Sequence, residues 1–125
     1  MISFAQLNEQ ISTKTKVWVY QFKKVLDESH LLHIQELLNQ FTESWESHGN
    51  KLNAKAFVVE SHFIVISVNQ NSFEASGCSI DKSVEVLRSI NQQYELDLFN
   101  RLTIAVLKNT KVRVYSKAEI QKELI

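Results

Sequence analysis

The chain has 125 residues, of which 44% are hydrophobic and 22% charged, a composition typical of one soluble domain with a single core. Its 14 basic and 14 acidic side chains cancel, so the net charge attracts neither nucleic acid nor an acidic membrane surface. With no proline and only two glycines, the sequence offers no flexible linker. We therefore expect a single domain over 1–125 with its core over 17–107, and neither nucleic acid nor a membrane as a partner.

The sequence also predicts a cytoplasmic location. The segment from Met1 to Gln6 does not combine a basic patch with an apolar run, and no apolar stretch has the length needed to span a bilayer. A lone cysteine, Cys78, cannot form a disulfide within the chain, which agrees with a reducing compartment.

The first elements in chain order are a short helix and a strand. Ser3 and Gln6 fit a capping box, and apolar side chains follow at helical spacing, which predicts an amphipathic helix over about 3–13. The run Val-Trp-Val-Tyr-Gln-Phe over 17–22 is β-branched and aromatic, so we expect a strand that is at least partly covered on both faces.

A long helix and a hairpin come next. Asp27 is suited to cap the N-terminus of the helix, and Gly49 is placed as the residue that ends it. The apolar positions of the helix form one stripe, Leu31, Ile34, Leu38, Phe41 and Trp45. The segments 56–60 and 62–68 indicate two strands so close in sequence that a tight hairpin around Ser61 must join them, so they should pair antiparallel.

A second long helix follows a polar loop. Ser79 is its expected N-cap, and helical spacing then continues through Ile80, Val84, Leu87, Asn91, Tyr94 and Leu98. The segments 102–107 and 112–115 predict two further strands joined by a turn at Asn109 and Thr110. A capping box at Ser116 predicts a short terminal helix, so that a hairpin and a helix complete the chain over about 108–125.

The order strand, helix, strand, strand, helix, strand over 17–107 is the split βαβ pattern of the ferredoxin-like α+β fold. We expect an antiparallel sheet of four to five strands with the two long helices on one face, plus the short helices near both ends of the chain. With right-handed crossovers, the four core strands take the order 4-1-3-2. This order brings the loop after the first long helix close to the loop before the second.

The second face of the sheet has no long helix predicted to cover it, although the first strand is apolar on both faces. Trp18, Tyr20 and Phe22 alternate onto one face, and Val17 and Val19 onto the other. Two alternatives stay open. Either the short terminal helices cover this face, or a second subunit does, which would make the protein a homodimer through the open sheet face.

The two loops that should meet carry the residues most suited to chemistry. Cys78 would lie at the N-terminus of the second long helix, where unpaired N–H groups favour a thiolate, and His48 is the nearest candidate base. The alternative is an unreactive, partly buried cysteine that packs beside Gly77.

The same helix start is a candidate site for a phosphate, a carboxylate or another small ligand, because its backbone N–H groups attract anions and nearby lysines supply positive charge. Plain capping of the helix is the alternative explanation of the serines, and an acidic residue in the first turn opposes an anion. The candidate ligand-binding residues are Ser76, Gly77, Ser79, Asp81, Lys51 and Trp45.

Other classes of site lack their signatures. Neither Gly49 nor Gly77 belongs to a P-loop, so ATP hydrolysis of that type is excluded. His30 and His33 lie three residues apart without a carboxylate or thiolate signature, so we expect solvated histidines, no metal site and no cofactor. The aromatic first strand invites comparison with the RNA-recognition motif, but the third strand lacks the glycine and aromatic pattern of that family.

Four segments carry a resemblance to a known family: Val17–Gln21, Trp45–Leu52, Ala75–Val84 and Phe99–Leu102. Over most of residues 17 to 107, the chain resembles small uncharacterised proteins from Bacteroidetes-type bacteria that share the motif A-S-G-C-S-I-D-x-S-V. These proteins are often labelled ABC transporter ATPases, a label that this sequence contradicts because it has no P-loop. The resemblance implies one compact cytoplasmic domain and draws attention to the loop from Gly77 to Asp81.

The function that we expect is that of a small cytoplasmic binding or interaction domain, with an anion or small-ligand site at the N-terminus of the second long helix. The alternative is a thiol-dependent enzyme in which Cys78 is the nucleophile, His48 its base, and backbone N–H groups hold the oxyanion. A third alternative is a structural partner of another protein, joined through the open sheet face or an edge strand.

Overall fold

The computed structural model describes residues 1–11, 15–70, 73–100, 103–108 and 111–116, with side chains in the first three ranges. The elements in chain order are α1 (Phe4–Gln10), β1 (Thr15–Gln21), α2 (Glu28–Ser44), β2 (Glu46–Ser47), β3 (Asn50–Lys51), β4 (Asn53–Val59), β5 (Phe63–Asn69), α3 (Gly77–Tyr94), β6 (Thr103–Lys108) and β7 (Lys111–Ser116). None of the helices in these ranges combines the length and hydrophobicity that crossing a membrane requires.

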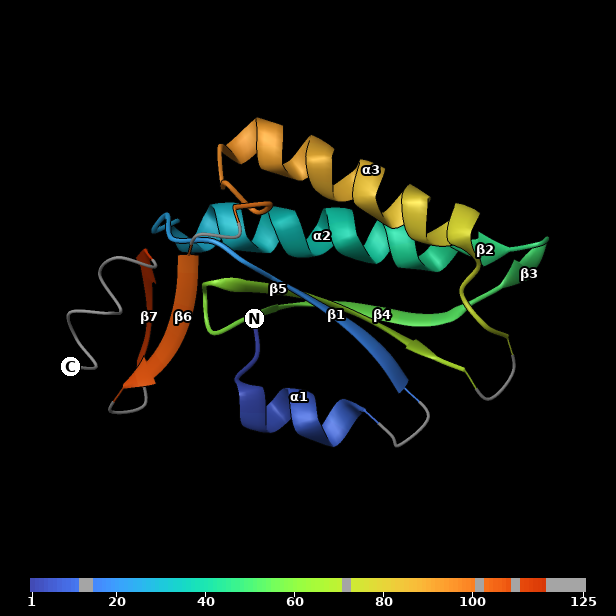
Figure 1. The fold of residues 1–125 in the computed structure, drawn as a ribbon, viewed down its shortest axis with the longest axis horizontal. Coiled ribbons are helices and arrows are strands. Elements are labelled where there is room, and N and C mark those ends of the chain that lie inside the picture. Colours follow the sequence, from blue (N-terminus) through green and yellow to red (C-terminus); the bar gives the residue numbers. More distant parts are fainter. Residues whose placement is uncertain (12–14, 71–72, 101–102, 109–110, 117–125) are drawn as a thin grey trace.

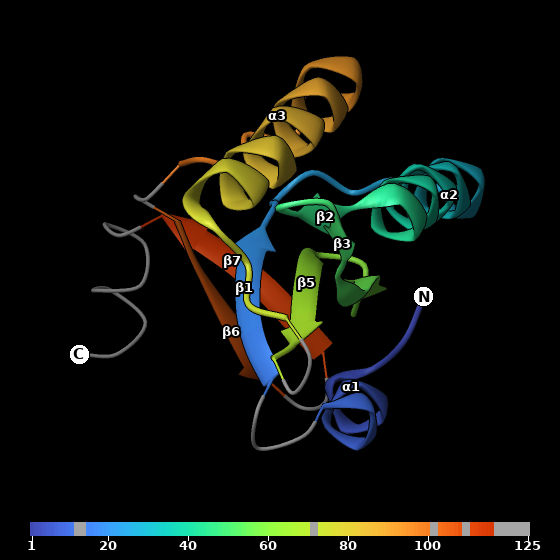
Figure 2. The same cartoon turned by 90° about the vertical axis from the view of Figure 1, so that its right-hand side faces the viewer.

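Three strands form the central sheet of this α+β fold. β5 lies in the middle and pairs antiparallel with β1 on one side and β4 on the other. The order β1-β5-β4 confirms three positions of the predicted 4-1-3-2 arrangement. α2 and α3 lie side by side over one face of the sheet, and α1 lies against the other (Figures 1 and 2).

The fourth predicted strand, β6, takes a different place. It pairs antiparallel with β7 in a separate two-stranded sheet, in a register that runs from Thr103↔Ser116 to Lys108↔Lys111. The hairpin occupies one edge of β6, and no described strand pairs with its other edge. In the described residues the predicted sheet of four to five strands is therefore a sheet of three and a sheet of two. The predicted C-terminal helix lies outside the described residues.

The middle strand β5 is buried on both faces, which explains its unbroken apolar run. Ile64, Ile66 and Val68 belong to the larger core, which the sheet forms with α2 and α3. Phe63 and Val65 belong to a second cluster that includes a buried leucine of α1. Of the two alternatives for the second sheet face, the structure therefore shows cover by a short terminal helix, α1.

The caps predicted for the first two helices are confirmed. The hydroxyl of Ser3 accepts the N–H of Gln6, and the Gln6 side chain accepts the N–H of Ser3 at 2.8 Å. The Asp27 carboxylate accepts the hydroxyl of Ser29 at 2.6 Å and the N–H of His30 at 2.9 Å. These hydrogen bonds, led by that of Ser29, lower the pKa of Asp27. All of the predicted apolar stripe of α2 is buried.

The first long helix ends before the predicted residue. α2 ends at Ser44, and Gly49 lies instead in the turn between β2 and β3. His48 and Gly49 have φ values of 52° and 79°, so both residues of this two-residue turn are left-handed, as hairpin turns favour. The prediction of Gly49 as the end of the helix is therefore wrong, because the glycine serves a hairpin.

The second long helix also ends early. α3 ends at Tyr94, and Glu95 caps it in a left-handed conformation with φ 54°. Leu98 reaches the core from beyond the helix, and its N–H donates to the side chain of Asn91 at 2.8 Å. This hydrogen bond explains why Asn91, a polar residue, occupies a position in the predicted apolar series.

The two edges of the central sheet differ. Along β4, Gln35 of α2 donates to the carbonyl of Ala56 at 2.8 Å and accepts the N–H of Val58 at 2.9 Å. Ile2 donates to the carbonyl of Val58 at 3.1 Å and accepts the N–H of Glu60 at 2.9 Å. These contacts satisfy backbone N–H and carbonyl groups that would otherwise make the edge strand prone to pair with another strand. Among the described strands β1 pairs with β5 alone, so no strand covers its outer edge.

Replacing Gln35 with alanine removes both of its hydrogen bonds to β4 and deprives the N–H of Val58, a residue with 0% exposure, of this partner. We expect the free energy of unfolding to fall by about 1–3 kcal/mol in urea denaturation. Gln40→Ala, on the exposed side of the same helix, is the control and should change it by less than about 0.5 kcal/mol. Equal stabilities of the two variants would contradict the role of Gln35 at this edge.

Candidate functional site

The two loops that were predicted to meet do so at the N-terminal end of α3. The indole N–H of Trp45, the residue after α2, donates to the carbonyl of Ser79 at 2.8 Å. Trp45 is 2% exposed, and its ring centroid lies 4.8 Å from that of Phe41 and 6.4 Å from that of Trp18. Its carbonyl accepts the N–H of Leu52 at 3.0 Å, which closes the β2–β3 hairpin beside α3 (Figure 1). Trp45 therefore anchors this junction from inside the core.

Ser76, rather than the predicted Ser79, caps α3. Ser76 is extended, with φ −82° and ψ 166°, and its hydroxyl accepts the N–H of Ser79 at 3.2 Å. The hydroxyl of Ser79, which is 4% exposed, donates back to the carbonyl of Ser76 at 2.8 Å. Two serines three residues apart offer the same capping pattern in the sequence, so only the backbone angles distinguish them. Both hydroxyls are used within the cap.

Gly77 and Cys78 are the first two residues of α3, and both are exposed. A Cβ added to Gly77 would contact nothing within 4 Å, so neighbouring atoms do not require a glycine there. The exposure of Cys78 contradicts the alternative in which this thiol is a partly buried packing residue.

His48, the candidate base, is exposed at the β2–β3 turn. Among the side chains that the structure describes, no hydrogen bond joins its imidazole to the thiol of Cys78. The Cys78–His48 pair therefore stays a prediction.

The charged candidates at this end of the sheet are dispersed. Lys51 on β3 and Asp81 in α3 are both exposed. Lys82 lies 3.8 Å from Glu85 in an ion pair on its own helix. Because capping accounts for both serine hydroxyls, the anion site at the start of α3 also stays a prediction.

The two histidines of α2 lie at the opposite end of the helix layer. The Nδ1 atom of His33, which is half-buried rather than solvated, pairs with the hydroxyl of Tyr94. The exposed His30 ring lies 5.4 Å from the ring of Tyr94, and its Nδ1 lies 3.4 Å from Asp27. These contacts tie the start of α2 to the end of α3. Within the described ranges, no group of three or more His, Cys, Asp or Glu side chains is placed to hold a metal ion.

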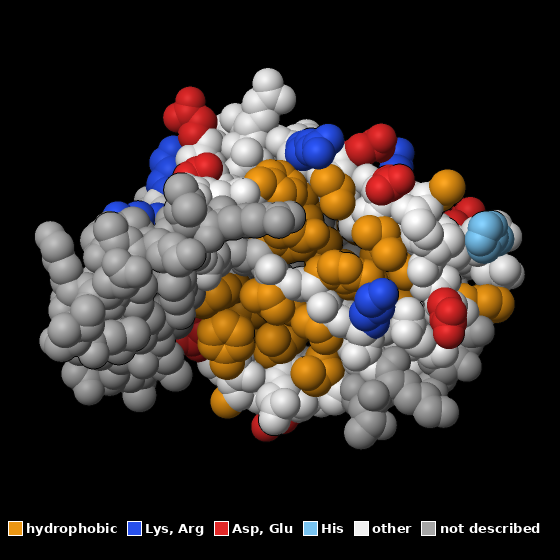
Figure 3. Space-filling model, in the orientation of Figure 1, with side chains coloured by type: hydrophobic (Ala, Val, Ile, Leu, Met, Phe, Trp, Pro, Cys, Tyr) orange, Lys and Arg blue, Asp and Glu red, His pale blue; other side chains and the backbone are white. Residues whose placement is uncertain are grey.

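Apolar side chains gather along the outer edge of β1. On the helix side of the strand, the rings of Tyr20 and Phe99 lie 5.9 Å apart, and burial raises the pKa of Tyr20. On the α1 side, Val19 is 56% exposed. Figure 3 shows hydrophobic side chains both above and below the line of β1. The sequence predicts that both faces of this strand are apolar, but it also predicts that the strand over 102–107 pairs with its outer edge.

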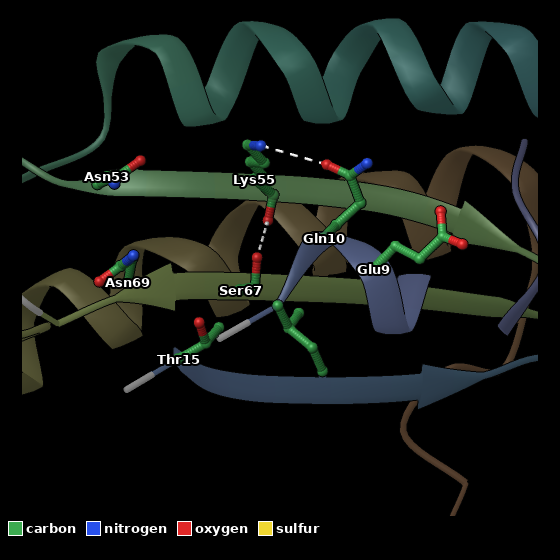
Figure 4. Close-up of a pocket in the computed structure, with 8 residues that line it drawn as sticks. Glu9, Gln10, Thr15, Asn53, Lys55, Ser67 and Asn69 are labelled. Carbon is green, nitrogen blue, oxygen red and sulfur yellow. Dashed lines mark hydrogen bonds between the residues drawn. The ribbon is translucent and has the colours of Figure 1, made fainter. Parts of the chain in front are cut away.

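A polar hollow of about 220 Å³ between α1 and the sheet was missed by sequence reasoning (Figure 4). Its lining consists of Glu9, Gln10, Ile11, Thr15, Asn53, Lys55, Ser67 and Asn69. The sequence feature that could have indicated it is a set of polar residues in the two strands of the hairpin, Asn53, Lys55, Ser67 and Asn69. These residues fall on one sheet face once the register is known.

Comparisons with protein-family models, with curated proteins and with solved structures find no match to this chain. The resemblance of most of residues 17 to 107 to a family of small bacterial proteins therefore stays a prediction.

The corrected cap of α3 can be tested by substitution. Ser76→Ala removes the hydroxyl that accepts the N–H of Ser79, so the free energy of unfolding should fall by about 1 kcal/mol in urea denaturation. Ser89→Ala, at an exposed position of the same helix, is the control and should leave stability unchanged or slightly higher. An unchanged stability of Ser76→Ala would argue against this cap.

The exposed thiol of Cys78 should react fully with iodoacetamide in the folded protein, without prior unfolding. Because the structure shows no bond between the two side chains, we expect the alkylation rate to be the same in His48→Ala. Mass spectrometry over time measures both rates. A rate that falls severalfold in His48→Ala would instead reveal a thiol–imidazole pair.

Proposed function

We propose that this domain is a protein-interaction module whose binding surface is the outer edge of β1, and that its partner is a second copy of the same chain. Each copy would add its β1 to the sheet of the other, so that two three-stranded sheets join into one. This is strand addition, in which main-chain hydrogen bonds provide affinity and neighbouring side chains provide specificity. The observation that carries the proposal is the contrast between the two edges of the sheet.

The β4 edge is closed by the chain itself. Gln35 and Ile2 bond the outward N–H and carbonyl groups of Ala56, Val58 and Glu60. At the β1 edge, no described strand supplies such partners. Proteins usually protect exposed edges, so a β1 edge with no described strand beside it, opposite a covered β4 edge, supports a role for β1 in pairing.

The side chains that flank β1 suit a dry contact. Trp18 and Tyr20 are half-buried on the helix side, next to Phe99, which is 41% exposed. Val17 and Val19 lie on the other side, and Val19 is more than half exposed. A contiguous apolar surface along a sheet edge is typical of an interaction site.

The sequence of β1 is also complementary to itself. In an antiparallel pair with its twofold axis at Trp18, Val17 would face Val19 of the second copy, and Lys16 would face Tyr20. The first pairing joins β-branched residues, and the second brings an ammonium group to an aromatic ring. No two like charges would stand opposite each other. This complementarity is our reason for choosing a second copy over an unrelated protein.

The competing occupant of the same edge is β6 of the same chain, which would complete the ferredoxin-like order 4-1-3-2. Within β6 the run Ile104–Leu107 is continuously apolar, which is typical of a strand covered on both faces. In that arrangement the edge of β1 would be filled within one molecule, so the protein would be a monomer. The two arrangements therefore make opposite predictions about mass in solution.

The experiment is sedimentation velocity of the whole chain and of Val19→Lys. We expect a dimer for the natural sequence and a monomer for the variant, with the dissociation constant raised at least tenfold, because a lysine on an edge strand opposes pairing. Leu32→Lys on α2 is a matched control, since Leu32 is 55% exposed and Val19 56% exposed, and it should remain a dimer.

A monomer for the natural sequence would overturn the proposal. Hydrogen exchange would then separate the remaining arrangements. Protected amides at Val17 and Val19 in a monomer would assign the edge to β6, whereas rapid exchange at these amides would leave the edge bare. A dimer that persists in Val19→Lys would place the interface elsewhere.

A further inference from the structure

We propose that the hollow between α1 and the polar end of the sheet binds a small zwitterion of amino-acid size. This proposal concerns the end of the α1-covered sheet face at which β1 begins, and it does not rest on the strand-addition proposal. It rests on the geometry of the hollow and on the charges that line it.

The floor of the hollow is built by the strand register. Thr15, Asn69 and Asn53 pair across β1, β5 and β4 to form one polar row, and Ser67 and Lys55 are neighbours in the next row. Ser67 is 5% exposed on a central strand that is otherwise apolar in its buried positions. Its hydroxyl donates to the carbonyl of Lys55 over 3.4 Å, which leaves its oxygen able to accept a bond from a ligand.

The wall of the hollow is the C-terminal end of α1. Leu7 is buried against the apolar part of the same sheet face, together with Phe63 and Val65. One turn further on, Gln10 accepts a hydrogen bond from the ammonium group of Lys55 at 3.3 Å, so the helix meets polar groups where the apolar rows end. Figure 4 shows side chains from α1, β1, β4 and β5 around this space.

Two opposite charges line the hollow. Glu9 comes from α1 and Lys55 from β4, and within the described part of the chain neither forms an ion pair. Lys55 is held at the wall by a neutral amide instead. A ligand with both a carboxylate and an ammonium group can pair with both residues at once, whereas a ligand with one charge leaves one of them facing a neutral or repelling group.

The lining also argues against other classes of ligand. It contains no aromatic ring, so a nucleobase would lack a stacking partner. It contains one lysine beside one glutamate, so a phosphate with two negative charges would be repelled as well as attracted. A volume of about 220 Å³ lies below the range of about 300–1,000 Å³ that is typical of pockets for drug-sized ligands, which suits a free amino acid better than a larger metabolite.

The test is titration of the ¹⁵N-labelled whole chain, followed by ¹H–¹⁵N spectra, with L-glutamine and L-serine as probes. Acetate and methylammonium, which carry one charge each, are the comparison probes. We expect saturable shifts at the amides of Lys55, Ser67 and Asn69 with at least one amino acid, and binding at least tenfold weaker for either single-charge probe. The absence of saturable shifts with both amino acids, or equal binding of acetate, would overturn the proposal.

Substitutions of residues that line the hollow test the same proposal. Lys55→Gln and Glu9→Gln should each weaken binding at least tenfold, while Lys51→Gln and Glu36→Gln, exposed changes of the same kind outside the hollow, should not. Ser67→Val fills the floor with a residue that favours strands, so it should keep the melting temperature and abolish binding. Unchanged affinity in the two charge variants, or in a folded Ser67→Val, would show that the amino acid binds elsewhere.

Discussion

The burial of β5 on both faces is the constraint from which the rest of the structure follows. A strand with Phe63, Val65, Ile64 and Ile66 all buried requires a layer of structure on each side of the sheet. α2 and α3 supply a full layer on one side, and α1 supplies a partial one on the other. Because β5 is central, β1 and β4 form the two edges of the described sheet. The arrangement therefore creates both features to which we assign binding: an incompletely covered face and a strand, β1, with no described strand at its outer edge.

Much of this architecture was predictable because the local signals agree with the tertiary contacts. The cap at Asp27 is satisfied by bonds within three residues of it, and the apolar stripe of α2 is buried as its period requires. The strands around Ser61 pair as expected because a tight turn leaves antiparallel pairing as the only option. The meeting of Trp45 with the start of α3 was predictable for a different reason, since it follows from strand order alone.

The errors occur where one local pattern serves two structures. Gly49 suits the end of a helix or a hairpin turn equally well, and the choice depends on the bond between Leu52 and Trp45, which no local pattern reveals. Ser76 and Ser79 offer the same cap. The polar hollow was missed because its residues come from four elements and share a face only after the register pairs Asn53 with Asn69. A site assembled from single residues on several elements produces no recognisable spacing pattern in the sequence.

α1 links the hydrophobic and the polar parts of the open face. A helix of seven residues is too short to be stable alone, so it depends on its capping box and on contacts such as the 4.9 Å ring contact of Phe4 with Phe63. The same docking that covers the apolar rows brings Glu9 and Gln10 over the polar ones. The hollow therefore exists only while α1 is docked. A molecule that bound there would contact both the helix and the sheet, and would stabilise the docked helix by its own binding energy.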